Sequence, residues 1–281
     1  METASTVQID QYEFRLKEHD EVRNGHVYCT ICNERVDGEG LDVFGNKMML
    51  RRACRCDREK QEQARKYQEQ QQLYQLKEMC FLSPEQHAIR LSEFAEKKSN
   101  ALRVAENYVH NFVQMSKDNI GLLFFGNVGT GKTFLACGIA NALIEEKRMR
   151  VRMVNLSQLV SDLSRHNFDD QGKRILEGIR YAPLLIIDDF GMERDTAYSK
   201  EKVYTIVNER YLSQRPTIIT TNLPISLFEN EDVDVNDRRI YSRILEMTLP
   251  VRVQGEDYRK TKQLQKRKTY EALIRNGGDR P

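Results

Sequence analysis

The sequence predicts an α/β fold, in which helices flank a parallel β-sheet and a small cysteine-bearing module and a helical linker come first. Three observations support this prediction. A glycine-rich loop joins an apolar strand to a helix at residues 121–133, a second apolar run ends in two aspartates at 183–191, and two cysteine pairs precede residue 57. Strands that alternate with helices after residue 120 are typical of parallel sheets.

The segment 121–133 reads GLLFFGNVGTGKT and completes the phosphate-binding loop pattern. The strand before it and the helix after it argue against an incidental glycine-rich turn. Glycines let successive N–H groups face one anion, and the helix adds its positive dipole end. We expect Lys132 to reach the β- and γ-phosphates of ATP and the Thr133 hydroxyl to bind Mg²⁺. The residues expected to contact the nucleotide are Gly126, Asn127, Val128, Gly129, Thr130, Gly131, Lys132, Thr133 and Phe134.

Two consecutive aspartates end the apolar run at 183–191, PLLIIDDFG. A central parallel strand of this kind carries its last residues to the same edge of the sheet as the phosphate-binding loop. We expect Asp188 to hold Mg²⁺ through its water shell and Asp189 to orient and polarise the attacking water. The alternative, that the two carboxylates merely form a turn, is disfavoured by the four apolar residues before them.

A further strand is predicted at 216–222, and it ends in the polar residue Asn222. An amide at the end of a strand beside the carboxylate strand is suited to hydrogen-bond the water or the γ-phosphate. An asparagine at a strand end is most often only a cap. Its position here favours the catalytic interpretation.

Four of the six cysteines form two close pairs, Cys29 with Cys32 and Cys54 with Cys56. The first spacing is that of a metal knuckle, and the second is tighter than usual but still places both sulfurs on one ion. Turn signals at 37–38 and 45–46 predict short hairpins that bring the pairs together. We expect a structural Zn²⁺ site, whose negative charge Arg51, Arg52 and Arg55 would offset. Unligated cysteines, or a cluster in which His26 replaces one cysteine, remain alternatives, whereas a catalytic zinc lacks an open position.

Residues 1–25 show apolar residues at helical spacing and predict a short amphipathic helix. Residues 57–79 are rich in Gln, Glu, Lys and Arg, without Gly or Pro, which predicts a solvated helix. We therefore expect a zinc-binding domain over residues 1–56, a charged helical linker over 57–79 and a nucleotide-binding domain over 80–281. Further helices are expected within 81–119, 157–164, 199–214 and 237–246, and strands at 150–155 and 249–253.

The composition excludes some classes of protein and leaves others open. The chain has 281 residues and a net charge of +2, so its partners cannot be inferred from overall charge. The basic segment 256–275 is more often a solvated helix than a DNA-binding surface. The N-terminal residues lack the pattern of a signal peptide, and no apolar run approaches the ~20 residues that span a membrane. We expect a cytoplasmic protein without membrane contact, whose cysteines are reduced.

The motifs together resemble the AAA+ ATPases of the DnaC/DnaI helicase-loader group, with the IstB transposition helpers as close relatives. The resemblance covers roughly residues 80–270. It rests on the phosphate-binding loop, the strand that ends in two aspartates, Thr-Thr-Asn222, Ser-Arg243 and the segment GEDYR that ends in Arg259. It implies the AAA+ (ASCE P-loop) fold with a five-stranded parallel sheet. The cysteine module resembles the zinc-bearing N-terminal domain of DnaI-like and phage loaders, which IstB helpers usually lack.

The resemblance assigns further roles. Arg243 matches the arginine finger that enters a neighbouring subunit's ATP site, and Arg259 matches the sensor-2 arginine of its own subunit. A ring or spiral of subunits is therefore implied. Such loaders bind single-stranded DNA inside the assembly and hold a hexameric replicative helicase through their N-terminal domain. Asp189 departs from the Glu usual in AAA+ enzymes, and this shorter side chain puts the rate of hydrolysis in question.

Three alternatives to a helicase loader are consistent with parts of the sequence. A transposition helper would use the same chemistry with a transposase as partner, although the cysteine module argues against it. An ATP-locked binding module with negligible turnover is kept open by Asp189. A small-molecule phosphotransferase would leave Asn222 and the two later arginines without a role.

Overall fold

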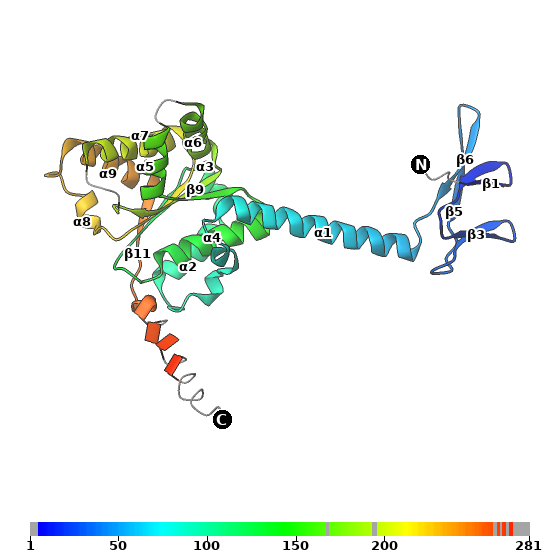
Figure 1. Ribbon diagram of the computed structural model, residues 1–281, viewed down its shortest axis with the longest axis horizontal. Coiled ribbons are helices and arrows are strands. Elements are labelled where there is room, and N and C mark those ends of the chain that lie inside the picture. Colours follow the sequence, from blue (N-terminus) through cyan, green and yellow to red (C-terminus); the bar gives the residue numbers. More distant parts are fainter. Residues whose placement is uncertain are drawn as a thin grey trace, which may run out of the picture. The chain divides into compact units, whose positions relative to one another are not determined.

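The computed structural model describes residues 5–166, 169–192 and 196–260, together with 263, 264, 266, 267, 270 and 271. Nine of the 20 residues of the predicted basic helix at 256–275 therefore lie outside the described residues. The chain divides into two compact units, residues 1–72 and residues 73–281, and Figure 1 shows the elements of both. Among the described residues, no helix is long and apolar enough to cross a membrane.

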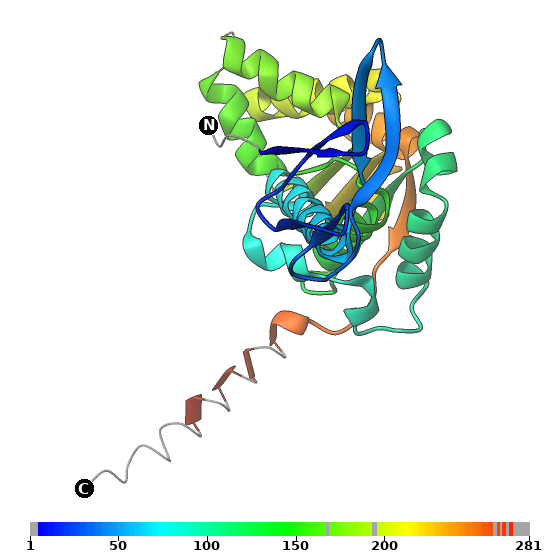
Figure 2. The same cartoon turned by 90° about the vertical axis from the view of Figure 1, so that its right-hand side faces the viewer.

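The first unit contains short strands, followed by the first part of a long helix. Four of them form a sheet in the order β1-β2-β6-β5, and β3 pairs with β4 in a separate hairpin. Figure 2 shows the long β5–β6 hairpin of this unit. A small core of Ile9, Phe14, Val27 and Val36 lies beside Cys29 and Cys54. The strands are β1 (Thr6–Ile9), β2 (Tyr12–Arg15), β3 (Asp20–Arg23), β4 (His26–Cys29), β5 (Asp37–Val43) and β6 (Asn46–Arg51).

The prediction of an amphipathic helix over residues 1–25 is wrong, because this segment forms three strands. Asp10 and Asn24 adopt left-handed backbone conformations, with φ of 55° and 49°, and Gly25 follows with 78°. Such residues form tight hairpin turns, and Asn-Gly is the usual sequence for them. The turn expected at 37–38 is also wrong, since Asp37 is a buried residue of β5. The turn beside Gly45 is present.

A long helix, α1 (Arg55–Cys80), follows the cysteine pairs and includes the helix expected over 57–79. Most of its length is solvated, and ion pairs one turn apart, such as Lys66 with Glu62 at 2.8 Å, support it. Its last turns differ, because Leu73 and Leu76 pack against the core of the second unit. There the Nζ of Lys77 also contacts the Glu145 carboxylate at 2.5 Å.

The second unit is built on a five-stranded parallel sheet in the order β11-β7-β10-β9-β8. Its three inner strands are buried on both faces, and two of them contain apolar runs, as expected for a parallel sheet. The predicted fold is therefore confirmed. The strands are β7 (Gly121–Phe125), β8 (Val151–Asn155), β9 (Leu184–Phe190), β10 (Thr217–Thr221) and β11 (Thr248–Arg252).

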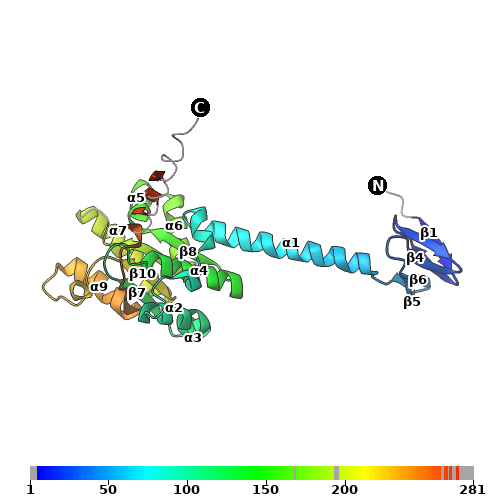
Figure 3. The same cartoon turned by 90° about the horizontal axis from the view of Figure 1, so that it is seen from below.

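Helices cover both faces of this sheet (Figure 3). Helices α2 and α4 share one hydrophobic core with the sheet, and α5, α6, α7 and α9 share the other. Helices α6 and α8 were not expected from the sequence. The helices are α2 (Asn100–His110), α3 (Phe112–Lys117), α4 (Lys132–Lys147), α5 (Leu156–Arg165), α6 (Asp170–Tyr181), α7 (Ala197–Ser213), α8 (Ile225–Phe228) and α9 (Val235–Met247). Two short 3-10 helices, Pro84–Ala88 and Leu91–Glu93, precede α2.

Candidate functional site

The glycine-rich loop connects the end of β7 to the start of α4. Gly126, Gly129 and Gly131 all have positive φ, at 146°, 81° and 93°. A Cβ atom at Gly131 would also lie only 2.7 Å from the Phe94 ring. Only glycine combines this backbone conformation with so close an approach. The loop therefore curls as an anion-binding loop must, with the N-terminus of α4 directly behind it.

Lys132 is the first residue of α4, and its side chain folds back over the loop. Its Nζ donates hydrogen bonds to the carbonyl oxygens of Gly126 at 2.9 Å and Asn127 at 2.7 Å. Burial lowers the pKa of Lys132, whereas the carboxylates of Asp189 and Asp188 raise it. An ammonium that is largely removed from water and held by neutral carbonyls gains most from an anionic ligand.

The carboxylate of Asp188 meets the Thr133 hydroxyl at the end of β9. Its Oδ1 accepts hydrogen bonds from Thr133 Oγ1 at 2.9 Å and from Thr220 Oγ1 at 2.6 Å. Burial is the main cause that raises the pKa of Asp188, and the negative charge of Asp189 adds to it. A hydroxyl and a buried carboxylate that converge in this way fit the oxygen ligands and water shell of Mg²⁺.

Asp189 reaches the same edge because β9 contains a bulge. Ile187 pairs with Ile219 and Phe190 pairs with Thr221, so that Asp188 and Asp189 together face the single residue Thr220. Asp189 has a φ of 59°, and its N–H donates to the Thr220 hydroxyl at 3.0 Å. In a regular strand, consecutive side chains would point to opposite faces. The extra residue instead re-aims the second carboxylate, as bulges beside active sites do.

A cavity of about 370 Å³ brings most of the expected residues together. Lys132, Thr133, Asp189, Asn222 and Arg259 all line it, and so do Val128, Gly129, Gly131 and Phe134. Gly126, Asn127 and Thr130 line a neighbouring cavity of about 550 Å³, which Asn222 also borders. One wall thus carries the cations Lys132 and Arg259 and the loop N–H groups, which can bind phosphates. The other carries the Asp189 carboxylate and the Asn222 amide, which can bind a water molecule.

Arg243 is an expected site residue that lines neither of these cavities. It lies on α9, where its guanidinium carbon is 4.7 Å from the centre of the Tyr204 ring and 5.5 Å from that of Tyr211. Arg239, one turn earlier, is exposed and borders another cavity beside Tyr204. Within one chain, Arg243 therefore has no contact with the candidate nucleotide site.

The sequence did not identify several residues that shape the site. Thr220 orients both aspartates, and its place near the end of a strand beside the one that carries them was the available signal. The segment after β11 lies on the loop, because the N–H of Tyr258 donates to the Gly129 carbonyl at 3.1 Å. The Tyr258 hydroxyl in turn donates to Glu96 at 3.3 Å. The Phe94 ring packs against the loop at Gly131 and contacts Phe134, with ring centres 5.9 Å apart. No local pattern marks these three contacts.

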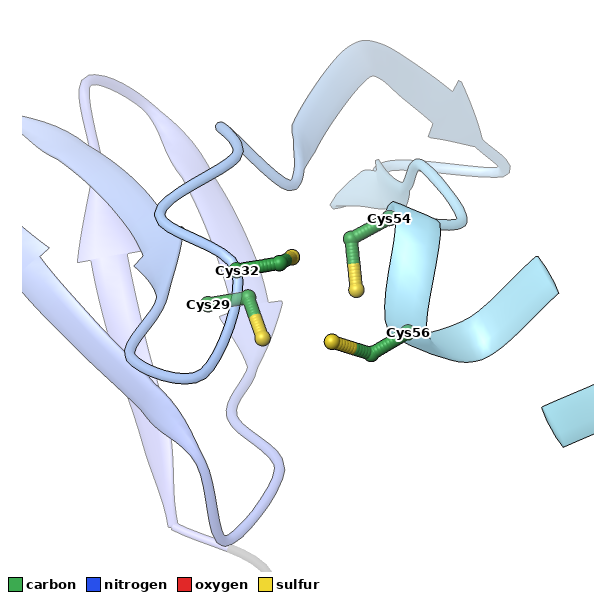
Figure 4. A group of neighbouring side chains, drawn as sticks. All are labelled: Cys29, Cys32, Cys54 and Cys56. Atoms are coloured by element: carbon green, nitrogen blue, oxygen red, sulfur yellow. The ribbon is translucent and has the colours of Figure 1, made fainter. Parts of the chain in front are cut away.

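The four cysteines of the first unit form one cluster (Figure 4). The Sγ atoms of Cys29, Cys32, Cys54 and Cys56 all lie within 4.8 Å of one another. Tetrahedral Zn–S bonds of about 2.3 Å place sulfurs roughly 3.8 Å apart, so small shifts suffice to close the site on one ion. His26 instead hydrogen-bonds Asp37 at 3.0 Å. The four-cysteine arrangement therefore fits a structural zinc ion.

Local charges also suit a metal cluster. Cys54 and Cys56 lie at the N-terminus of α1, whose dipole favours thiolates. Backbone N–H groups lower the pKa of Cys32 to about 6, whereas burial and the neighbouring sulfurs raise the pKa of Cys56 to about 12. A bound cation would offset the repulsion between the sulfurs and hold all four as thiolates.

Arg51, near the second cysteine pair, pairs with carboxylates, whereas we expected it to offset the charge of the sulfurs. Arg51 pairs with Asp20 and, at 3.1 Å, with Asp57. Asp57 in turn accepts hydrogen bonds from the N–H and the thiol of Cys54, both at 3.4 Å. Asp57 therefore links the arginine to the cluster.

Residues 56–266 match the model of a family described as IstB-like ATP binding protein. The match covers well over half of the chain. The chain belongs to this ATP-binding family. The expected resemblance is confirmed, and the loop and carboxylates described above occupy the matched region.

Curated relatives carry two kinds of name. The replicative helicase loader DnaI of Bacillus subtilis is 31% identical over 148 residues, which are 50% of this chain and 47% of the relative. The replicative helicase loader DnaC of Escherichia coli is 32% identical over 131 residues, 45% of this chain and 51% of the relative. A putative ATP-binding protein in an insertion sequence of Mycobacterium tuberculosis is 30% identical over 147 residues. These are 50% of this chain and 56% of the relative. The chain spans about half the length of these relatives.

Solved structures agree with the fold. The crystal structure of the DnaC helicase loader matches with a TM-score of 0.52 and 25% identity over 61% of this chain and 100% of that one. The crystal structure of DnaI matches with a TM-score of 0.52 and 23% identity over 63% of this chain and 94% of that one. The AAA+-like architecture of the second unit is therefore confirmed.

Proposed function

We propose that the chain is an ATP-dependent loader of a hexameric replicative helicase onto single-stranded DNA during replication initiation. The observation that carries the proposal is the match of the nucleotide-binding unit to relatives named replicative helicase loaders. The four-cysteine cluster, which precedes that unit in the sequence, supports the same assignment. The proposed domains are a helicase-binding zinc domain over residues 1–56, a linker over 57–79 and an ATPase domain over 80–281.

The proposed chemistry is hydrolysis of ATP to ADP and phosphate. The loop amides and Lys132 bind the phosphates, while Asp189 accepts a hydrogen bond from the attacking water and Asn222 helps to hold it. The water oxygen attacks the γ-phosphorus, the bond to the β–γ bridging oxygen breaks, and ADP keeps that electron pair. The water's proton passes to Asp189 and then to solvent. Mg²⁺, held through Thr133 and Asp188, neutralises the charge of the phosphates when bound.

Hydrolysis is proposed to require a neighbouring subunit. Arg243 lies outside its own chain's cavity, whereas Arg259 lines that cavity. A planar, permanently charged guanidinium suits the charge that spreads over the transferring phosphoryl group. We assign Arg243 to the site of the adjoining copy and Arg259 to its own site. The chain would then assemble as a ring or spiral around single-stranded DNA.

A second candidate function is that of a transposition helper. The family description and the Mycobacterium tuberculosis relative from an insertion sequence favour it. The chemistry would be the same, but the partner would be a transposase. The four-cysteine unit is the feature that argues for the loader.

The test is a loading assay with the full-length chain and the purified replicative helicase of the same genome. We expect the two to form a complex, and ATP to promote transfer of the helicase to circular single-stranded DNA. The Lys132→Ala variant, which retains the cysteine cluster, serves as the control and should bind the helicase without completing transfer. Failure of the wild-type chain to bind the helicase, with binding to a co-encoded transposase instead, would contradict the loader assignment.

A further inference from the structure

The guanidinium of Arg243 lies over two aromatic rings of the neighbouring helix. Tyr204 and Tyr211 are both on α7, and the distances from the guanidinium carbon to their ring centres are 4.7 Å and 5.5 Å. The two tyrosines are seven residues apart, so they lie on the same face of the helix, two turns from one another. Cations are attracted to the negative faces of such rings. The two rings therefore restrict where the guanidinium can lie.

The charge of Arg243 has no carboxylate partner among the described residues. In the part of the chain that the structure describes, no carboxylate forms an ion pair with it, and its buried Nη1 has no hydrogen-bond partner. By contrast, Lys200 of α7 does form an ion pair with a carboxylate, that of Asp237 on α9, at 2.8 Å. A guanidinium without a carboxylate partner is suited to bind the oxygens of a phosphate.

An acidic residue lies one turn further along α9 but is engaged elsewhere. Glu246 follows Arg243 by three residues, a spacing at which helix side chains are neighbours. Its Oε1 accepts a hydrogen bond from the Tyr211 hydroxyl at 2.9 Å. Tyr211 thus contacts the arginine with its ring and the acid with its hydroxyl. Tyr204 contributes only its ring, because its hydroxyl makes no hydrogen bond among the described residues.

We propose that Tyr204 and Tyr211 are positioning residues for Arg243. Their rings hold the guanidinium in place, and the Tyr211 hydroxyl keeps Glu246 from pairing with it. The cation remains charged and free for the phosphate of ATP bound to an adjoining copy. This inference rests on the proposed function, in which Arg243 completes a neighbour's site.

The first test separates the ring of Tyr204 from its hydroxyl. Steady-state ATP hydrolysis is measured with full-length protein, Mg²⁺ and an oligothymidine strand, at protein concentrations where kcat no longer rises. We expect Tyr204→Phe to match the wild type within about twofold and Tyr204→Leu to lower kcat about tenfold. The KM for ATP should not change, because neither variant alters the cavity that binds the nucleotide.

The second test separates the two contacts of Tyr211. Tyr211→Phe keeps the ring but releases Glu246, and we expect kcat to fall about tenfold as the acid pairs with Arg243. Adding Glu246→Gln removes the acid's charge and should restore kcat to within about threefold of the wild type. Glu246→Gln alone should leave kcat unchanged. A purely structural role of Tyr211 would not be rescued in this way.

Arg243→Ala distinguishes failure of this inference from failure of the proposed function. If Arg243→Ala abolishes hydrolysis while Tyr204→Leu and Tyr211→Phe retain wild-type kcat, the positioning role is overturned and the trans role stands. If Arg243→Ala hydrolyses ATP normally, or the wild type shows no turnover, the proposed function fails and this inference fails with it. Unchanged melting temperature and ATP affinity verify the fold of each variant. Should Tyr204→Leu not fold, the Tyr211 and Glu246 variants decide alone.

Discussion

Asp188→Asn is expected to stabilise the nucleotide-free protein at neutral pH while removing its Mg²⁺-dependent activity. Asp188 is 6% exposed and lies beside a second carboxylate, and both conditions raise its pKa. An asparagine in the same place keeps an Oδ1 that accepts from Thr133 and Thr220. The substitution therefore removes a buried charge without breaking either hydrogen bond.

The pH dependence of this effect follows from the direction of the pKa shift. Because the folded state binds the proton of Asp188 more tightly than the unfolded state, the contribution of Asp188 to stability is fully present at low pH and is lost as pH rises through the folded pKa. Removing a buried charge while keeping its hydrogen bonds removes a desolvation penalty, so we expect Asp188→Asn to gain on the order of 1–2 kcal/mol at about pH 8. The gain should be smaller at pH 4 than at pH 8, because a protonated Asp188 carries no buried charge.

The assay is urea unfolding in Mg²⁺-free buffer at both pH values, followed by hydrogen exchange in peptides from β7 and β9. These strands report on the second unit separately from the zinc domain. The same variant should lose ATP hydrolysis by on the order of 100-fold, because a neutral amide is a poor partner for a hydrated Mg²⁺. A variant that is less stable than the wild type at pH 8, or equally changed at both pH values, would refute the reasoning.

Three further outcomes follow from the same contacts. Lys132→Ala should lose ATP affinity in calorimetric titration, and normal affinity would show that the loop is not the phosphate site. Elemental analysis should find about one zinc ion per chain, and chelation should abolish exchange protection in residues 5–56; a metal-free protein with that protection intact would exclude the zinc site. Arg210→Met should lower the free energy of unfolding by about 3 kcal/mol, because the buried guanidinium donates to the carbonyls of Ile179, Ala182 and Pro216 at 2.5–3.0 Å. A change below about 1 kcal/mol would contradict that role.

The nucleotide-binding unit was predictable because its signals are local. A buried parallel strand reads as an apolar run, and the loop between β7 and α4 has a nearly fixed sequence. The two aspartates follow the same logic, since their strand ends at the loop's edge of the sheet. What could not be predicted was how both carboxylates face one way, because the bulge depends on pairing with Thr220 in a strand about 30 residues further along the chain.

The N-terminal unit was harder to predict because its core is small. Ile9, Tyr12 and Leu16 happen to fall at helical spacing, but Ile9 and Phe14 are the residues buried there. Asn24-Gly25 is a typical hairpin-turn sequence and indicated strands on either side of it. The helical spacing of the apolar residues pointed to a helix instead. Likewise, Tyr258 reaches the phosphate-binding loop from the far end of the chain, a contact that no local pattern contains.

The most direct test of the whole account is to mix two inactive variants. Arg243→Ala should bind ATP without hydrolysing it, and Lys132→Ala should keep the arginine while binding ATP poorly. In a mixed assembly, some intact sites form between an Arg243→Ala subunit that holds ATP and a Lys132→Ala neighbour that supplies the guanidinium. The account predicts that phosphate release reappears on mixing, up to about a quarter of the wild-type rate at equal amounts. Mixtures that stay as inactive as each variant alone, although the subunits co-assemble, would contradict it.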